Sequence, residues 1–187
     1  MLALVVVAGL TSVVLLSVGG AAGVAGRVSA PPWAAPTDVE QRARAAGLTM
    51  LTKEGTVLHL HQHLSISVDG KPVTVPSHLG IDEAADRISP IHTHDRTGIL
   101  HVESPVKRTF RLGQVFTEWD VALQEGRIGG YRDGSDGVRI GVFVDREAYR
   151  GDPRRIVLRE RQDLDLVITT DGSDPVPPAA FAFPSNY

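Results

Sequence analysis

The sequence contains no cysteine, which excludes disulfides, thiolate metal sites and cysteine nucleophiles. Its two methionines, Met1 and Met50, are too few for a methionine-rich Cu(I) site. The formal net charge of −3 lacks the basic excess that nucleic-acid-binding domains usually carry, so we expect no nucleic-acid partner. Any metal ion would therefore be held by nitrogen and oxygen ligands.

Charged side chains are also missing from residues 1–26, where Leu, Val, Ala and Gly predominate. About 20 apolar residues let a helix span a bilayer, so this segment indicates a transmembrane anchor. A cleaved signal peptide is the alternative, and Gly19-Gly20 disfavours a buried soluble helix. Arg27 is the first basic residue, so charge bias determines the orientation poorly. We expect a single-pass protein of the cell membrane with an extracytoplasmic domain, which would be secreted if the segment is cleaved.

The remaining length suits a single domain. We expect a Pro/Ala linker over 27–36, a globular domain over 37–174 and an extended Pro-rich tail over 175–187. Thr37 and Glu40 have the spacing of a capping box, which predicts a short helix that ends at Gly47.

Apolar and polar residues alternate from residue 58 to residue 68, which predicts a half-buried strand. The core-facing set is Leu58, Leu60, Leu64, Ile66 and Val68, and the opposite set is His59, His61, His63, Ser65 and Ser67. Gln62 is the one exception to this alternation. Asp69-Gly70 predicts a hairpin turn into a return strand over 71–76.

The later segments complete an α+β pattern. We expect a second hairpin from strands 91–95 and 99–103, a helix over 112–123, and strands over 138–145 and 156–169. This order predicts a small, mostly antiparallel sheet with one packed helix. The stretches TFRLGQVFTEW and VRIGVFVDREAYRGDPRRIVLRERQDLDLVI resemble the strand-to-helix transition and the closing strands of ligand-binding β-grasp modules, which implies a β-grasp-like fold.

All seven histidines lie between His59 and His101, mostly in the segments HLHQH and HTHD. Histidines two apart on a strand project from the same face, about 6–7 Å apart at Cα, so neutral imidazoles placed in this way can bind one ion. The candidate metal ligands are His59, His61, His63, His92, His94 and His101. Nitrogen ligands suit Cu(II) and Zn(II). A solvent-exposed polar strand face is the alternative, and His78, in a loop, is expected at the surface.

Two acidic residues accompany the histidines. Asp95 begins the turn Asp-Arg-Thr-Gly and either caps its own backbone or orients a ligating imidazole. Glu103 is a metal ligand, a general base or an ordinary charge at a strand end.

The register of the second hairpin decides which histidines converge. A two-residue loop pairs His92 with His101 and places His94 on the same face. A three-residue loop with Gly98 in the left-handed region pairs Thr93 with His101 and turns His101 and Glu103 away from the other two. The glycine favours the second register.

The segments LHLHQHLSISVDGKPVTVPSHLGI, SPIHTHDRTGILHVESP and RTFRLGQVFTEWDVAL carry an HxHxH…HTHDxTGxxHxES pattern. From Leu58 onward, most of the chain resembles a family of membrane-anchored, His-rich proteins of bacteria, particularly actinobacteria, and archaea. That family has no assigned activity. The resemblance therefore implies an exported single domain and supplies no catalytic residues.

Three functions are compatible with the sequence. The first is metal handling or sensing at the outer membrane face, with Cu(II) or Zn(II) as the bound partner. The second is a metalloenzyme with an open three-histidine site and Glu103 or Asp95 as proton acceptor. The third is a metal-free β-grasp-like interaction module whose histidines respond to pH. No HExxH, cupin or Ser-His-Asp pattern identifies a reaction or its catalytic residues.

Overall fold

The computed structural model describes residues 26–185 and residue 187. The expected membrane segment, 1–26, lies outside the described residues except for Gly26. Within the described ranges, no helix is both long enough and apolar enough to cross a membrane.

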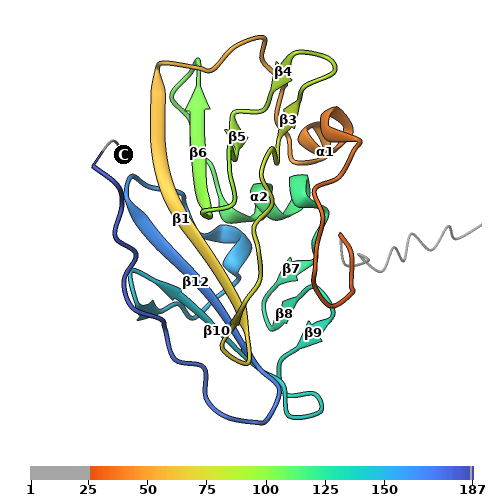
Figure 1. The fold of residues 1–187 in the computed structure, drawn as a ribbon, viewed down its shortest axis with the longest axis vertical. Coiled ribbons are helices and arrows are strands. Elements are labelled where there is room, and N and C mark those ends of the chain that lie inside the picture. The colour runs from red at the N-terminus through yellow and green to blue at the C-terminus, as the bar shows by residue number, and fades with distance from the viewer. Residues whose placement is uncertain (1–25, 186) are drawn as a thin grey trace, which may run out of the picture.

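A seven-stranded sheet organises the chain, with the strand order β11-β10-β12-β1-β6-β5 and with β2 also paired to β1 (Figure 1). The strands are β1 (Leu58–Val68), β2 (Lys71–Pro72), β5 (Ile91–His92), β6 (Ile99–Ser104), β10 (Arg139–Val144), β11 (Glu147–Ala148) and β12 (Gln162–Thr169). The β1–β12 pair is parallel and the other pairs are antiparallel. The predicted α+β class with a mostly antiparallel sheet is therefore confirmed.

Smaller elements surround this sheet. They are α1 (Val39–Ala45), β3 (Ile81–Asp82), β4 (Arg87–Ile88), α2 (Leu112–Trp119), β7 (Leu123–Gln124), β8 (Arg127–Ile128), β9 (Tyr131–Arg132) and the 3₁₀ helix η1 (Pro153–Arg155). β3 pairs with β4, and β7, β8 and β9 form a three-stranded sheet. α2 lies behind the main sheet in Figure 1 and buries one apolar face, which consists of Leu112, Val115, Phe116 and Trp119.

The alternation along β1 sorts its side chains as predicted. Leu64 and Ile66 are buried in the core, and His59, on the opposite face, is exposed. Gln62 points with the leucines into the core and is fully buried. The turn after β1 has positive φ at both Asp69 and Gly70, as an Asp-Gly hairpin turn requires.

Several predicted elements are shorter than expected. The return strand expected over 71–76 ends at Pro72, and the strand expected over 91–95 ends at His92. The helix expected over 112–123 ends at Trp119, because Asp120 adopts the left-handed conformation. The strand expected over 156–169 begins only at Gln162, because Arg161, with φ 52°, breaks the extended chain. In α1 the residue before the helix is Asp38, so Thr37 does not form the predicted cap.

The segment 27–36 is not a free linker. The backbone of Arg27 donates to Asp120 O at 2.8 Å and accepts from Ala122 N at 3.0 Å. Trp33 is 2% exposed and packs edge-on against Trp119, whose indole N–H donates to the Trp33 carbonyl at 3.0 Å. The Pro/Ala composition of this segment does not indicate the docking, because a single aromatic residue, Trp33, makes the contact.

Residues 175–185 form no helix or strand and run alongside the sheet (Figure 1). The Phe181 N–H donates to Asp163 on β12 at 2.8 Å, and Arg161 donates to the carbonyl of Tyr187. The chain therefore ends against the face of β1 that carries the histidines.

Gly98, at the start of β6, provides a test of this packing. It has φ +86°, its carbonyl accepts from Leu64 N at 2.9 Å, and an added Cβ would lie 2.5 Å from Leu64 O. Gly98→Ala should therefore lower the free energy of unfolding by about 1–3 kcal/mol more than Gly70→Ala, as measured by urea denaturation. Gly70 has φ +73° but open space around it, so Gly70→Ala measures the cost of the left-handed backbone without the clash. Equal losses would contradict this account.

Candidate metal centre

Strand register places five of the candidate residues on one face. His61 lies opposite His101 and His59 opposite Glu103 across β1 and β6, and His92 lies opposite His101 across β5 and β6. Directly paired residues project from the same face of a sheet. The observed His92–His101 pairing corrects the register that Gly98 suggested. Thr93 turns away to bond with Leu79 O at 3.0 Å, so no tight hairpin determines the pairing.

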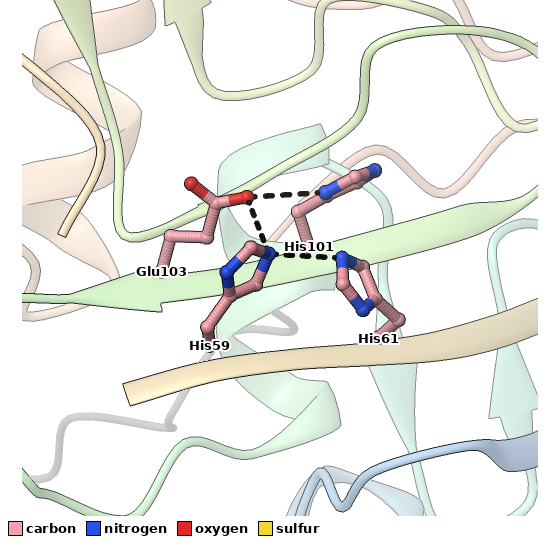
Figure 2. Close-up of side chains that lie close together, drawn as sticks. All are labelled: His59, His61, His101 and Glu103. Carbon is pink, nitrogen blue, oxygen red and sulfur yellow. Dashed lines mark hydrogen bonds and ion pairs between the residues drawn. The ribbon is translucent and has the colours of Figure 1, made fainter. Parts of the chain in front are cut away.

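The first group of donors lies between β1 and β6 (Figure 2). The Nε2 atoms of His59 and His61 are 3.1 Å apart, and His59 Nε2 is 3.3 Å from Glu103 Oε1. The same Oε1 is 3.2 Å from His101 Nδ1. Four ligands at the Zn–N distance of about 2.05 Å stand about 3.3 Å apart in a tetrahedron, so these spacings suit one ion.

The second group lies on the other side of β6 and contains His92, His94, His101 and Glu103. The Nε2 atoms of His92 and His94 are 3.2 Å apart, and the rings of His94 and His101 are 4.5 Å apart. In each group the donor atoms all lie within 4.8 Å of one another. Both groups are therefore compact enough to hold a metal ion.

Burial keeps the central imidazoles uncharged. It lowers the pKa of His92 to about 4 and that of His101 to about 3, with the neighbouring histidines adding to the effect. Burial also lowers the pKa of His61, and His59 contributes next. Burial and, after it, the neighbouring Glu54 raise the pKa of Glu103 to about 7. At neutral pH His92 and His101 are thus neutral imidazoles, the form that binds metals.

Neighbouring groups lie beside two of the rings, and one of these groups orients its ring by a hydrogen bond. His92 Nδ1 lies 2.9 Å from the Ser89 carbonyl, which can only accept, so Nδ1 carries the proton and Nε2 presents its lone pair to the site. Glu160 stands behind His61: its carboxylate accepts from the His61 backbone N–H at 2.9 Å and lies 3.9 Å from Nδ1. The His92 arrangement follows the pattern of a supported histidine ligand, whereas 3.9 Å is too long for a hydrogen bond to the His61 ring.

The other predicted residues lie elsewhere. His63 belongs to neither group: its Nδ1 is 2.8 Å from Asp163 Oδ1, and its ring stacks on Phe181 at 3.7 Å. Asp95 accepts from Thr97 N at 2.8 Å and from the Thr97 hydroxyl, which is the turn-capping role. His78 is exposed and contacts Glu83 at 3.2 Å.

Two residues at the centre carried no signal in the sequence. Glu54 Oε1 lies 3.6 Å from His94 Nε2, and the same side chain faces Glu103. The Tyr187 ring lies 4.7 Å from His61 and 5.7 Å from His101. Neither belongs to a histidine motif, and only tertiary folding brings them to the centre.

Glu118 of α2 is a buried acid beneath this face. Its side chain is 2% exposed, and burial raises its pKa to about 8, an effect that Ser89 partly offsets. The Ser89 carbonyl is the acceptor that orients His92. The core below the centre therefore contains a carboxyl group that is mostly protonated at neutral pH.

Comparisons with protein-family models, with curated proteins and with solved structures find no match to this chain.

The buried Glu118 predicts a pH-dependent stability for the metal-free protein. Its folded pKa of about 8 exceeds the 4.5 of an ordinary Glu, so its contribution is fully present below pH 4.5 and lost as pH rises to about 8. Between pH 7 and pH 8.5 the wild type should lose about 1 kcal/mol that Glu118→Gln retains, in urea unfolding with chelator present. The exposed-site control Glu125→Gln should behave as the wild type. Parallel curves for wild type and Glu118→Gln would contradict the assignment.

Proposed function

We propose that this domain binds a transition metal ion, Cu(II) or Zn(II), and serves metal handling or sensing. The observation that carries the proposal is the convergence of five imidazoles and Glu103 on one face. The ligands are His59, His61, His92, His94, His101 and Glu103. Nitrogen donors with a single carboxylate favour these two ions over Mg²⁺ or Ca²⁺, which prefer oxygen.

A metal-free role accounts poorly for the burial. His92, His101 and Glu103 have side chains only 0%, 8% and 4% exposed, and taking such polar groups out of water is unfavourable unless they are paired. The Nε2 atoms of His92 and His94 face each other at 3.2 Å, where a metal ion would satisfy both lone pairs. This supports a metal centre over an interaction module whose histidines only titrate.

The cellular setting is part of the same proposal. The uncharged run over 1–26 and the HxHxH…HTHDxTGxxHxES resemblance support a membrane anchor with the domain outside the cytoplasm. The β-grasp-like interpretation is also a proposal, supported by the parallel β1–β12 pair at the middle of the sheet and by α2 packed across it.

A metalloenzyme is the second candidate, and the exposed rim of the centre favours it. The side chains of His59 and His94 are 54% and 43% exposed, so an ion here would be within reach of water or a small ligand. If the centre reacts, the Co(II)-loaded protein should change its visible spectrum when azide is added. An unchanged spectrum up to about 100 mM azide would leave metal holding as the function.

The metal content provides the direct test. The full chain, purified without a histidine tag, stripped and reloaded, should retain at least one equivalent of Zn(II) or Cu(II) after washing, as measured by elemental analysis. His101→Ala should weaken binding by at least about tenfold, because both groups use this side chain.

The control is His78→Ala, which removes an imidazole that contacts only Glu83 at the surface and should leave metal binding unchanged. If His101→Ala folds poorly, His94→Ala, which changes an exposed side chain of the second group, should also weaken metal binding. Less than about a tenth of an equivalent in the wild type would overturn the proposal.

A further inference from the structure

The histidines of the centre form two pairs on opposite sides of one strand. His59 and His61 belong to β1. His92 ends β5 and His94 follows it two residues later, and β6 runs between β1 and β5 (Figure 1). The Nε2–Nε2 distance is 3.1 Å in the first pair and 3.2 Å in the second. Each pair therefore has the spacing of two ligands on one ion.

A single ion would leave donors unused. Zn(II) takes four ligands and a catalytic site offers three from the protein, whereas this centre offers five imidazoles and a carboxylate. The donors that lie within 4.8 Å of one another form two groups, and each group contains only one of the histidine pairs. The shared members, His101 and Glu103, both come from the middle strand.

Glu103 lies where its carboxylate could bridge two metal ions. Its Oε1 is 3.3 Å from His59 Nε2 on one side and 4.0 Å from His92 Nε2 on the other. Both distances end on the same oxygen, and a carboxylate oxygen has two lone-pair sites, so Oε1 could contact one ion on each side; ions in two-metal sites stand about 3.5–4 Å apart. Because Glu103 is buried, its position between the pairs is fixed by the sheet.

Charge also favours a second ion. If one ion were bound on the His59 side, beside the Glu103 carboxylate, the negative charge of Glu54 on the His94 side would have no metal ion next to it. Glu54 Oε1 lies 3.6 Å from His94 Nε2. A second dication there would have two imidazoles and two carboxylates within reach, which is a complete ligand set for a divalent transition metal.

We propose that the centre is dinuclear. One ion is held by His59 and His61, the other by His92 and His94, Glu103 bridges them, and His101 lies between both groups. This inference rests on the proposed metal-binding function and adds the number of ions and their arrangement.

The test is metal stoichiometry in paired variants of the full chain. After loading with Zn(II) and washing, the wild type should hold two equivalents. The double variants His59→Ala/His61→Ala and His92→Ala/His94→Ala should each hold one equivalent. The matched control, His63→Ala/His78→Ala, also removes two histidines, both outside the two groups, and should hold two.

A spectroscopic measurement tests the bridge. Two Cu(II) ions joined by one carboxylate couple magnetically, so the integrated EPR signal of the Cu(II)-loaded wild type should fall well below its copper content. In His59→Ala/His61→Ala the signal should account for all of the remaining copper. If a double variant folds poorly, the exposed single variants His59→Ala and His94→Ala should each weaken one ion and spare the other.

The outcomes separate the two proposals. One equivalent in the wild type, lost from both double variants, would mean that both pairs serve one ion, and it would overturn the dinuclear arrangement while the metal-binding function stands. No retained metal in the wild type would overturn both. Two equivalents with a full EPR signal would overturn the Glu103 bridge.

Discussion

The register among β1, β6 and β5 is the constraint on which the centre depends. Because side chains alternate along a strand, a slip of one residue would turn His101 and Glu103 into the core and bring Leu100 and Val102 to the outer face. Backbone bonds at both ends of β6 fix this register: Leu64 N donates to Gly98 O at 2.9 Å, and Val57 N donates to Ser104 O at 3.1 Å. The same bonds that close the sheet therefore set the spacing of the ligands.

Burial gives this centre a cost that a metal ion would offset. Desolvation holds His92 and His101 uncharged and holds Glu103 partly protonated at neutral pH. The His92 side chain, for example, has lost its contact with water, and its Nε2 faces the Nε2 of His94 at 3.2 Å instead of a complementary partner. A dication would replace the lost interactions and would favour the ionised carboxylate. Metal binding would consequently stabilise the folded protein, because a ligand that binds only the folded state adds to its stability.

Local patterns in the sequence predicted the features that a single strand determines. They did not predict the contacts that form where several segments meet. The period-two alternation predicted β1, its two faces and the outward direction of His59, His61 and His63, because a half-buried strand requires that alternation. The His92–His101 pairing was not predictable from turn chemistry, because β5 is two residues long and Thr93 bonds to Leu79 instead of continuing a hairpin. Glu54 and Tyr187 reach the centre through tertiary folding alone, and Trp33 docks a segment whose composition is that of a linker.

The two sides of the centre differ in access. Tyr187 stacks edge-on against His61 and His101, and Phe181 covers His63, so the extended tail shields the β12 side of the histidine face. His59 and His94 remain the most exposed ligands, and they belong to different pairs. An ion bound by either pair would therefore exchange ligands at the rim and not beneath the tail. Glu54 lies at that rim with its side chain 51% exposed and its Oε1 3.6 Å from His94 Nε2. If an ion were bound there, whether it was only held or could react would depend on whether Glu54 or an external ligand occupied this position.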